Sequence, residues 1–426
     1  MDLTKSAKED LAKAVGRAER SYAKLHGRNL ALDMTRGKPA PDQLDLADDM
    51  LTIVGHGETA GDDGTDYRNY GILAGIPEAK KFFAEYMEVT PKEIVVGGNS
   101  SLTMMYDAMM GAMYFGMPGG DKPWKDQGPV KLICPVPGYD RHFAICERLG
   151  IEMVTVGMTP EGPDMDAVEA LVKNDASIKG IWCVPKYSNP SGETYADATV
   201  DRLARMPVAA ADFRVFWDNA YAVHHLGDGP APLKNMLDAC KQAGNPERVL
   251  MFGSTSKITH AGAGVAIMAA SEVNVTDALK KMFYSSIGPD KINQLRHVRF
   301  FKDMQGLLAH MDEQAKLIAP KFAAVEAALS KNLAGKGIAK WTAPKGGYFV
   351  SVEVLEGCAA EIIKLADAAG VKLTPAGATH PYGKDPKDSF IRLAPTMPSV
   401  QEIETAMEVF CACVELVAAK KLQAQG

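Results

Sequence analysis

An apolar run leads through small and hydroxyl residues to a lysine in the segment Val249-Leu250-Met251-Phe252-Gly253-Ser254-Thr255-Ser256-Lys257. The apolar part predicts a buried strand, and the small and hydroxyl residues that follow predict a turn at the strand end. A lysine in such a turn suits Schiff-base chemistry, because a pocket that disfavours the ammonium leaves a nucleophilic amine near neutral pH. An ordinary surface lysine fits the same nine residues, so the assignment depends on other segments.

A second strand end carries an acid. In the segment Val215–Tyr221, Asp218 directly follows an apolar run, and a buried acid is costly unless it is paired. A protonated pyridine nitrogen would be a suitable partner for Asp218, and the phenol of Tyr221 could hydrogen-bond a ring hydroxyl. A capping aspartate beside a core tyrosine is the alternative.

Two further turns carry polar or aromatic side chains. Asn189 opens the pattern Asn-Pro-x-Gly, and Asn-Pro marks a turn. Tyr139 could stack on a planar cofactor, and His142 follows it three residues later.

In this order, these segments resemble the class I aminotransferases of the aspartate aminotransferase family, which are fold-type-I pyridoxal-phosphate enzymes. The resemblance covers nearly the whole chain. It implies an α/β fold with a large domain around a mainly parallel central sheet and a smaller α+β domain. It also implies bound pyridoxal 5'-phosphate and these roles: Lys257 carries the cofactor, Asp218 pairs with the pyridine nitrogen, Tyr221 and Asn189 donate to the ring 3-oxygen, Tyr139 stacks on the ring, and His142 supports Asp218.

The phosphate end of the cofactor is expected at Val95–Leu102, a strand, a glycine turn and a helix start. Backbone N–H groups and hydroxyls at a helix start can face an anion, although a capped helix without a ligand fits equally well. The candidate phosphate ligands are Asn99, Ser100, Ser101, Ser254 and Ser256.

One departure from the family concerns the phosphate charge. The family usually has an arginine seven or eight residues after the lysine, and these positions are Gly264 and Val265 here. Because a buried anion normally finds a counter-charge, we expect Lys291 or Arg296 to compensate.

Arg392 lies among alternating apolar residues near the C-terminus, and its guanidinium matches a carboxylate bidentately. The resemblance implies that it holds the substrate α-carboxylate. For a second carboxylate the family has an arginine where this chain has Lys281. The loop Thr35–Pro39 resembles the family's substrate-covering segment; it places Gly37 at the substrate and offers Arg36 and Lys38. Aspartate is therefore the expected amino donor, with a 2-oxo acid such as 2-oxoglutarate as acceptor.

The segment Asn69–Glu78 resembles the one whose tyrosine reaches the phosphate of the neighbouring subunit. By itself it is a glycine-rich turn before a helix. With the other motifs, Tyr70 implies a homodimer with shared active sites.

Length and composition agree with this interpretation. We expect, from 426 residues, an N-terminal arm with part of the small domain at 1–53, a large cofactor domain at 54–300 and a small domain at 301–426. A net charge of −6 without a long basic run argues against nucleic acid as a partner. A polar N-terminus, no long apolar stretch and seven scattered cysteines predict a cytoplasmic protein with reduced thiols, no membrane segment and no bound metal.

Strands alternate with helical patterns through the central region, as in a mainly parallel sheet. The expected strands are 94–96, 130–134, 153–156, 180–184, 215–217 and 249–252. The stretch 117–129 is expected to be an exposed loop, and 293–329 a long helical region.

Other reactions fit the same residues. An aminotransferase of another specificity, a C–S lyase or an amino-acid decarboxylase of this fold would need much the same site. A ligand-sensing regulator with an aminotransferase-like module is less favoured, because thirty N-terminal residues are too few for a winged helix.

Overall fold

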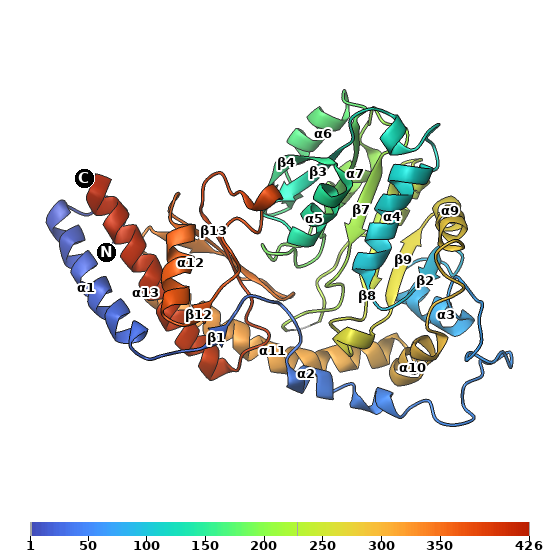
Figure 1. Ribbon diagram of the computed structural model, residues 1–426, viewed down its shortest axis with the longest axis horizontal. Helices are drawn as coiled ribbons and strands as arrows, with labels where there is room; N and C mark the ends of the chain where they lie inside the picture. Colours follow the sequence, from blue (N-terminus) through green and yellow to red (C-terminus); the bar gives the residue numbers. More distant parts are fainter. Residues whose placement is uncertain (1, 228, 426) are drawn as a thin grey trace.

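The computed structural model describes residues 2–227 and 229–425, and its largest element is an eight-stranded sheet (Figure 1). The strand order is β2-β9-β8-β7-β6-β3-β4-β5. Strands β3, β4, β6, β7 and β8 pair in parallel, whereas β9 and β5 pair antiparallel with their neighbours. The bounds are β2 Ile94–Val96, β3 Lys131–Val136, β4 Glu152–Thr159, β5 Gly162–Pro163, β6 Ile178–Cys183, β7 Arg214–Asp218, β8 Val249–Ser254 and β9 Ala266–Ala270.

Helices cover both faces of this sheet, so its strands are apolar on both sides. Val215 and Trp217 of β7 enter one buried core, and Phe216 between them enters the other. The first core includes residues of α3 (Pro77–Tyr86), α6 (Met165–Val172), α7 (Asp197–Arg205), α8 (Met236–Gln242), α10 (Lys291–Phe301) and α11 (Met304–Leu333). The second includes residues of α4 (Ser101–Phe115), α5 (Asp140–Leu149) and α9 (Glu272–Met282).

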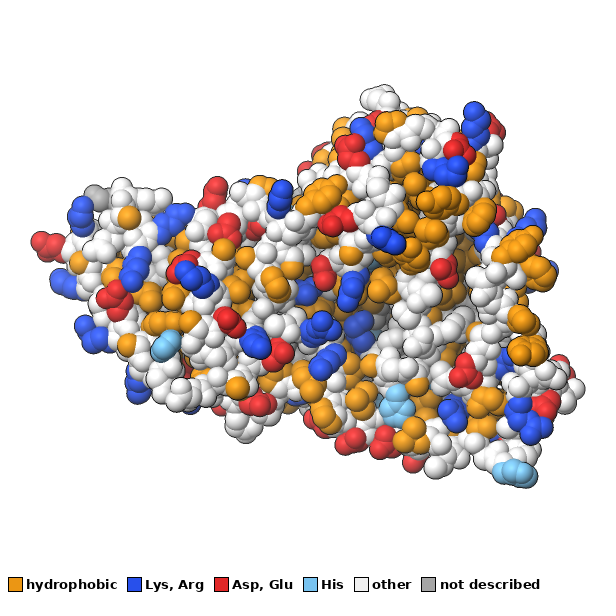
Figure 2. Space-filling view, viewed as in Figure 1, with side chains coloured by type: hydrophobic (Ala, Val, Ile, Leu, Met, Phe, Trp, Pro, Cys, Tyr) orange, Lys and Arg blue, Asp and Glu red, His pale blue; other side chains and the backbone are white. Residues whose placement is uncertain are grey.

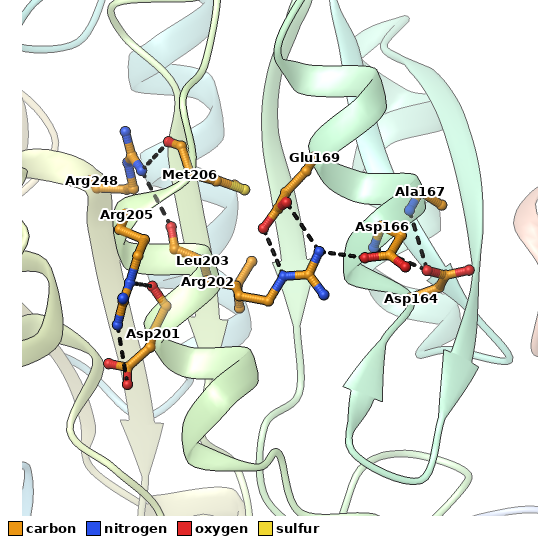
Figure 3. Close-up of polar contacts among 10 residues, drawn as sticks. All are labelled: Asp164, Asp166, Ala167, Glu169, Asp201, Arg202, Leu203, Arg205, Met206 and Arg248. Atoms are coloured by element: carbon orange, nitrogen blue, oxygen red, sulfur yellow. Dashed lines mark hydrogen bonds and ion pairs between the residues drawn. The ribbon is translucent and has the colours of Figure 1, made fainter.

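Arginine side chains fasten neighbouring helices on the first face (Figure 3). The guanidinium of Arg202 on α7 contacts both carboxylate oxygens of Glu169 on α6, at 2.8 and 3.0 Å, and reaches Asp166 at 2.6 Å. Arg248 lies deeper and donates to the backbone carbonyls of Leu203 and Met206. These contacts hold α6 and α7 in place beside β6 and β7, whose ends carry site residues.

A second, smaller part is built around an antiparallel sheet of β10 (Ala339–Trp341), β11 (Val350–Val354) and β13 (Phe390–Leu393). β1 (Leu32–Asp33) pairs in parallel with β12 (Val371–Lys372). Figure 1 shows α1 (Lys8–His26) beside α13 (Val400–Gln425), and α11 running from beneath the large sheet to the smaller part. Helix α12 (Ala359–Ala368) completes it, and α2 (Pro41–Asp45) lies against α11, where Gln43 contacts Gln314. The N-terminal and C-terminal segments thus share one core.

The expected α/β class and all six expected strands are confirmed. Strand β9 was missed, because its Ala-Ile-Met-Ala-Ala run carries little strand signal. The expected helical region at 293–329 is two helices, interrupted where Lys302 has a positive φ of 67°. The stretch 117–129 is not simply an exposed loop, since Trp124 is fully buried edge-on to Phe216. The domain boundaries stay a prediction.

All seven cysteines are buried and unpaired. Across residues 2–227 and 229–425, no helix combines the length and the apolar character that crossing a membrane requires.

Candidate functional site

A cavity lies where the ends of β6, β7 and β8 meet the start of α4, as expected for an α/β sheet. Asp218 ends β7 and Lys257 follows β8 by three residues. Six of the predicted site residues line this one cavity: Ser101, Tyr139, Asn189, Asp218, Tyr221 and Lys257.

The two carboxylate oxygens of Asp218 have different surroundings. Oδ2 lies 3.0 Å from Nε2 of His142, and both side chains are at most 4% exposed. The ring of His142 stacks on Trp182 at 4.2 Å, which fixes its position. Oδ1 is buried and has no hydrogen-bond partner within the described chain. A buried carboxylate oxygen without a donor indicates a place for a ligand N–H group.

The amine of Lys257 lies 5.0 Å from the ring centroid of Tyr221. Burial lowers the pKa of Lys257, and the charge of Asp218 opposes this shift. A lowered pKa enlarges the neutral, nucleophilic fraction at a given pH.

Two tyrosines enclose the cavity. Burial raises the pKa of Tyr221 well above its ordinary value, and burial likewise raises the pKa of Tyr139. Both phenols therefore remain protonated donors at neutral pH. The ring of Tyr139 meets His142 edge-on at 4.9 Å, so it stands beside the Asp218 pair.

Arg392 approaches from β13 of the smaller sheet. Its Nη1 donates to Oδ1 of Asn189 and Oδ1 of Asp140, both at 3.2 Å, and its guanidinium lies 4.8 Å from the ring centroid of Phe349. Nε is buried and lacks a partner among the residues described. The Nε edge of the guanidinium is thus available for an added acceptor.

The predicted phosphate ligands are divided between two places. Ser101 lines the Lys257 cavity at the first residue of α4, whereas Asn99 and Ser100 line a different cavity. Oγ of Ser256 donates to the carbonyl of Asn99 at 3.2 Å, so the turns after β8 and β2 are joined. Ser254, the last residue of β8, is buried.

Gly264, one of the two positions where the family usually has an arginine, is closely packed. A Cβ on Gly264 would lie 3.0 Å from the backbone nitrogen of Ser256 and 3.1 Å from its Oγ. Neither expected substitute cation lines the Lys257 cavity of the same chain. Lys291 is buried and donates to the carbonyl of Gly71 at 3.2 Å, and Arg296 has a buried Nε without a partner in the described part of the chain.

Gly37 and Tyr70, two other predicted site residues, do not line the Lys257 cavity. A Cβ on Gly37 would lie 2.5 Å from Cζ of Phe349, so the loop Thr35–Pro39 presses against the ring that supports Arg392. Tyr70 is 81% exposed and is not part of the Lys257 cavity in one chain.

Lys281 does not join the cluster within one chain. Its ammonium lies 2.5 Å from Asp277 and donates to the carbonyl of Gly116 at 2.6 Å. It lines a separate, mainly apolar cavity of about 430 Å³ between α4 and α9. The paired charge and this location leave its substrate role a prediction that would need the partner subunit.

The residues that contact the backbone carbonyl of Lys257 were not identified from the sequence. Nε2 of His224 lies 3.2 Å from the Lys257 carbonyl, and burial, followed by the charge of Lys257, lowers the pKa of His224 to about 3. The hydroxyl of Tyr348 donates to the same carbonyl at 3.3 Å and accepts from Nε2 of Gln43 at 3.2 Å. The spacing of His224, three residues after Tyr221, was the available signal; Gln43 gave none.

The sheet order, the helices on both faces and the lysine after β8 define the fold-type-I transferase class. A family model described as aspartate amino-transferase matches residues 4–426, and the chain belongs to that family. It is 46% identical to an aspartate aminotransferase of Corynebacterium glutamicum, over 94% of this chain and 93% of the relative.

Solved structures agree. A crystal structure of an aspartate transaminase from Corynebacterium glutamicum matches with a TM-score of 0.97 and 44% identity, over 99% of both chains. An α-aminoadipate aminotransferase of Thermus thermophilus, complexed with N-(5'-phosphopyridoxyl)-L-leucine, matches with a TM-score of 0.74 and 22% identity, over 97% of this chain and 98% of that one. The second likeness concerns the fold alone.

Proposed function

We propose that this aminotransferase binds pyridoxal 5'-phosphate and moves the amino group of aspartate to a 2-oxo acid such as 2-oxoglutarate. The observation that carries the proposal is the cavity that holds Lys257 together with the unpartnered Oδ1 of Asp218. A reactive amine and a buried, free carboxylate oxygen in one cavity suit a cofactor with an aldehyde and a basic ring nitrogen.

The remaining residues fit the cofactor's other groups. Oδ1 of Asp218 would accept from the protonated ring nitrogen, Tyr221 and Asn189 would meet the ring 3-oxygen, and Tyr139 would lie against the ring face. Ser101 at the start of the fifteen-residue α4 would bind the phosphate, because a helix N-terminus offers free N–H groups. Further donors near this end are Asn99, Ser100, Ser254 and Ser256.

When bound, the cofactor supplies an electron sink for the bonds at the substrate Cα. The chain supplies charge and orientation. Lys257, with its lowered pKa, would take the proton from the substrate Cα and deliver it to the cofactor carbon that accepts the amino group. His142 holds Asp218 in place, and His224 stays uncharged, so no second cation stands beside the amine. Arg392 holds the α-carboxylate and thereby sets which Cα bond is oriented for cleavage.

A dicarboxylate is the proposed donor because the loop Thr35–Pro39, whose Gly37 packs against Phe349 beside Arg392, carries two cations. Arg36 and Lys38 are exposed, and neither guanidinium nor ammonium has an ion-pair partner in the described residues. The relative named as an aspartate aminotransferase supports the same choice. We therefore favour Arg36 or Lys38 over Lys281 for the side-chain carboxylate.

The active unit is proposed to be a homodimer. Large apolar side chains are exposed near Tyr70: Phe283, Tyr284 and Ile287 are 71%, 89% and 66% exposed. The backbone nitrogen of Gly71 donates to the carbonyl of Ile287, so the two loops form one surface. Figure 2 shows hydrophobic side chains gathered over the region of α4 and α9. An exposed apolar surface of this kind is typical of an interface.

The test uses holoenzyme with aspartate, with and without 2-oxoglutarate. We expect glutamate and oxaloacetate in equal amounts, and no turnover beyond one per site without the acceptor. Continued release of ammonia or carbon dioxide without a 2-oxo acid would instead indicate a lyase or a decarboxylase.

A further inference from the structure

The guanidinium of Arg392, which is proposed to bind the substrate carboxylate, is already in contact with an acidic side chain. Asp140 is the first residue of α5, beside Tyr139, and its Oδ1 lies 3.2 Å from Nη1 of Arg392. The side chain of Arg392 is 8% exposed and that of Asp140 is 42% exposed. The contact joins α5 of the large sheet to β13 of the smaller sheet, so it spans the two parts of the chain.

Asp140 is not needed to orient the guanidinium. Oδ1 of Asn189 accepts from the same Nη1 at 3.2 Å, and the ring of Phe349 supports the guanidinium plane. What Asp140 alone adds among these contacts is a negative charge. Asp140 and Asn189 occupy Nη1, and Nε is left free for an incoming carboxylate.

We propose that Asp140 is an affinity-determining residue: its carboxylate offsets the charge of Arg392 and weakens the binding of substrate carboxylates there. The proposal rests on the proposed role of Arg392 as the carboxylate ligand. A ligand carboxylate bound at Nε and the Asp140 carboxylate at Nη1 would be on the same guanidinium. Two negative charges that close repel each other in a partly desolvated site. Weaker binding of substrate and product carboxylates favours release after transfer, because tight ground-state binding does not lower the barrier.

The experiment measures succinate, a dicarboxylate without an amine, binding to the holoenzyme by titration calorimetry. Asp140→Asn keeps the shape and the hydrogen-bond acceptor and removes only the charge. We expect its succinate dissociation constant to fall by about two- to fivefold, which is the range for a part-exposed charge contact. The gain should shrink as sodium chloride is raised, because salt screens this repulsion and would not change a purely structural effect. Asp140→Ser, a second neutral variant, should change in the same direction.

Two comparisons separate this proposal from the proposed function. Glu147→Gln removes an exposed charge from the same helix and should leave succinate binding unchanged. Arg392→Leu should weaken succinate binding strongly, and Asp140→Asn should then have a much smaller effect in the Arg392→Leu background, because succinate no longer docks beside Asp140. If Arg392→Leu binds succinate normally, the carboxylate role of Arg392 fails. If Arg392→Leu weakens binding while Asp140→Asn leaves it equal or weaker, the role of Asp140 is overturned.

Discussion

Nε2 of His142 and Oδ2 of Asp218 lie 3.0 Å apart in a buried pair, and this contact leaves Oδ1 of Asp218 as the oxygen that can meet a ligand. The two residues come from different elements: His142 lies in α5, and Asp218 is the last residue of β7. A carboxylate supported on one oxygen only is prepared to bind a protonated ring nitrogen with the other.

Replacing Asp218 with asparagine should therefore abolish most of the transamination activity while the cofactor stays bound. A neutral amide cannot hold the ring nitrogen in its protonated form, and loss of a preorganised electrostatic partner costs about 100-fold or more in rate. Steady-state rates and the absorbance of bound cofactor would measure the two effects. Near-normal turnover would show that Asp218 has only a structural role.

His224 should make the protein less stable in acid. Its pKa is about 3 in the folded chain and about 6.5 when unfolded, so the unfolded chain binds the proton more readily. The stability that neutral His224 provides is complete above pH 6.5 and falls by about 1.4 kcal/mol per pH unit as pH drops from 6.5 towards 3.

His224→Gln should flatten that part of the stability curve, measured by urea unfolding between pH 4 and pH 7. His56→Gln, at an exposed position, is the control. Parallel pH curves for His224→Gln and the unchanged protein would mean that His224 is not held neutral by the fold.

The close packing at Gly264 predicts a loss of cofactor affinity on adding a side chain. Gly264→Ala places a methyl group 3.0 to 3.1 Å from the backbone and Oγ of Ser256, so the hydroxyl turn must shift. A Cβ on the nearby Gly262 meets nothing within 4 Å, which makes Gly262→Ala a matched control. Titration of apoenzyme with pyridoxal phosphate should give a larger dissociation constant for Gly264→Ala alone; equal values for the two variants would contradict the packing argument.

The main elements of the fold were predictable because strong local patterns marked them. Val249–Lys257 and Val215–Tyr221 each combine an apolar run with a polar end, and parallel strands bring such ends together. Strand β9 lacked a strand pattern, since three of its five residues are alanines, which favour helices over strands. The contacts of Asp140 and Gln43 join segments more than 200 residues apart, and nothing local to either residue records the partner.

Shared active sites can be tested with hybrid dimers. Tyr70 is 81% exposed and lies outside the Lys257 cavity of its own chain, so a role in catalysis requires the partner's cavity. Mixing Lys257→Ala subunits with Tyr70→Ala subunits should restore up to one intact site per hybrid dimer and regain activity that both parents lack. A fully active monomer in solution would refute the shared site.

The last prediction concerns the side-chain carboxylate of the donor. Arg36 is exposed, borders the Gly37–Phe349 contact and has no ion-pair partner among the described residues, whereas the ammonium of Lys281 is already paired with Asp277. One charge-assisted contact contributes about 1.5–3 kcal/mol, so aspartate should exceed alanine by more than about tenfold in kcat/KM. Arg36→Ala should narrow that ratio with little change for alanine, and Lys281→Ala should narrow it less, as rates with 2-oxoglutarate as acceptor would show. If only Lys281→Ala abolishes the preference for aspartate over alanine, the side-chain carboxylate binds at Lys281 of the partner subunit instead. Equal kcat/KM values for aspartate, alanine and phenylalanine in the unchanged enzyme would reject a dicarboxylate donor.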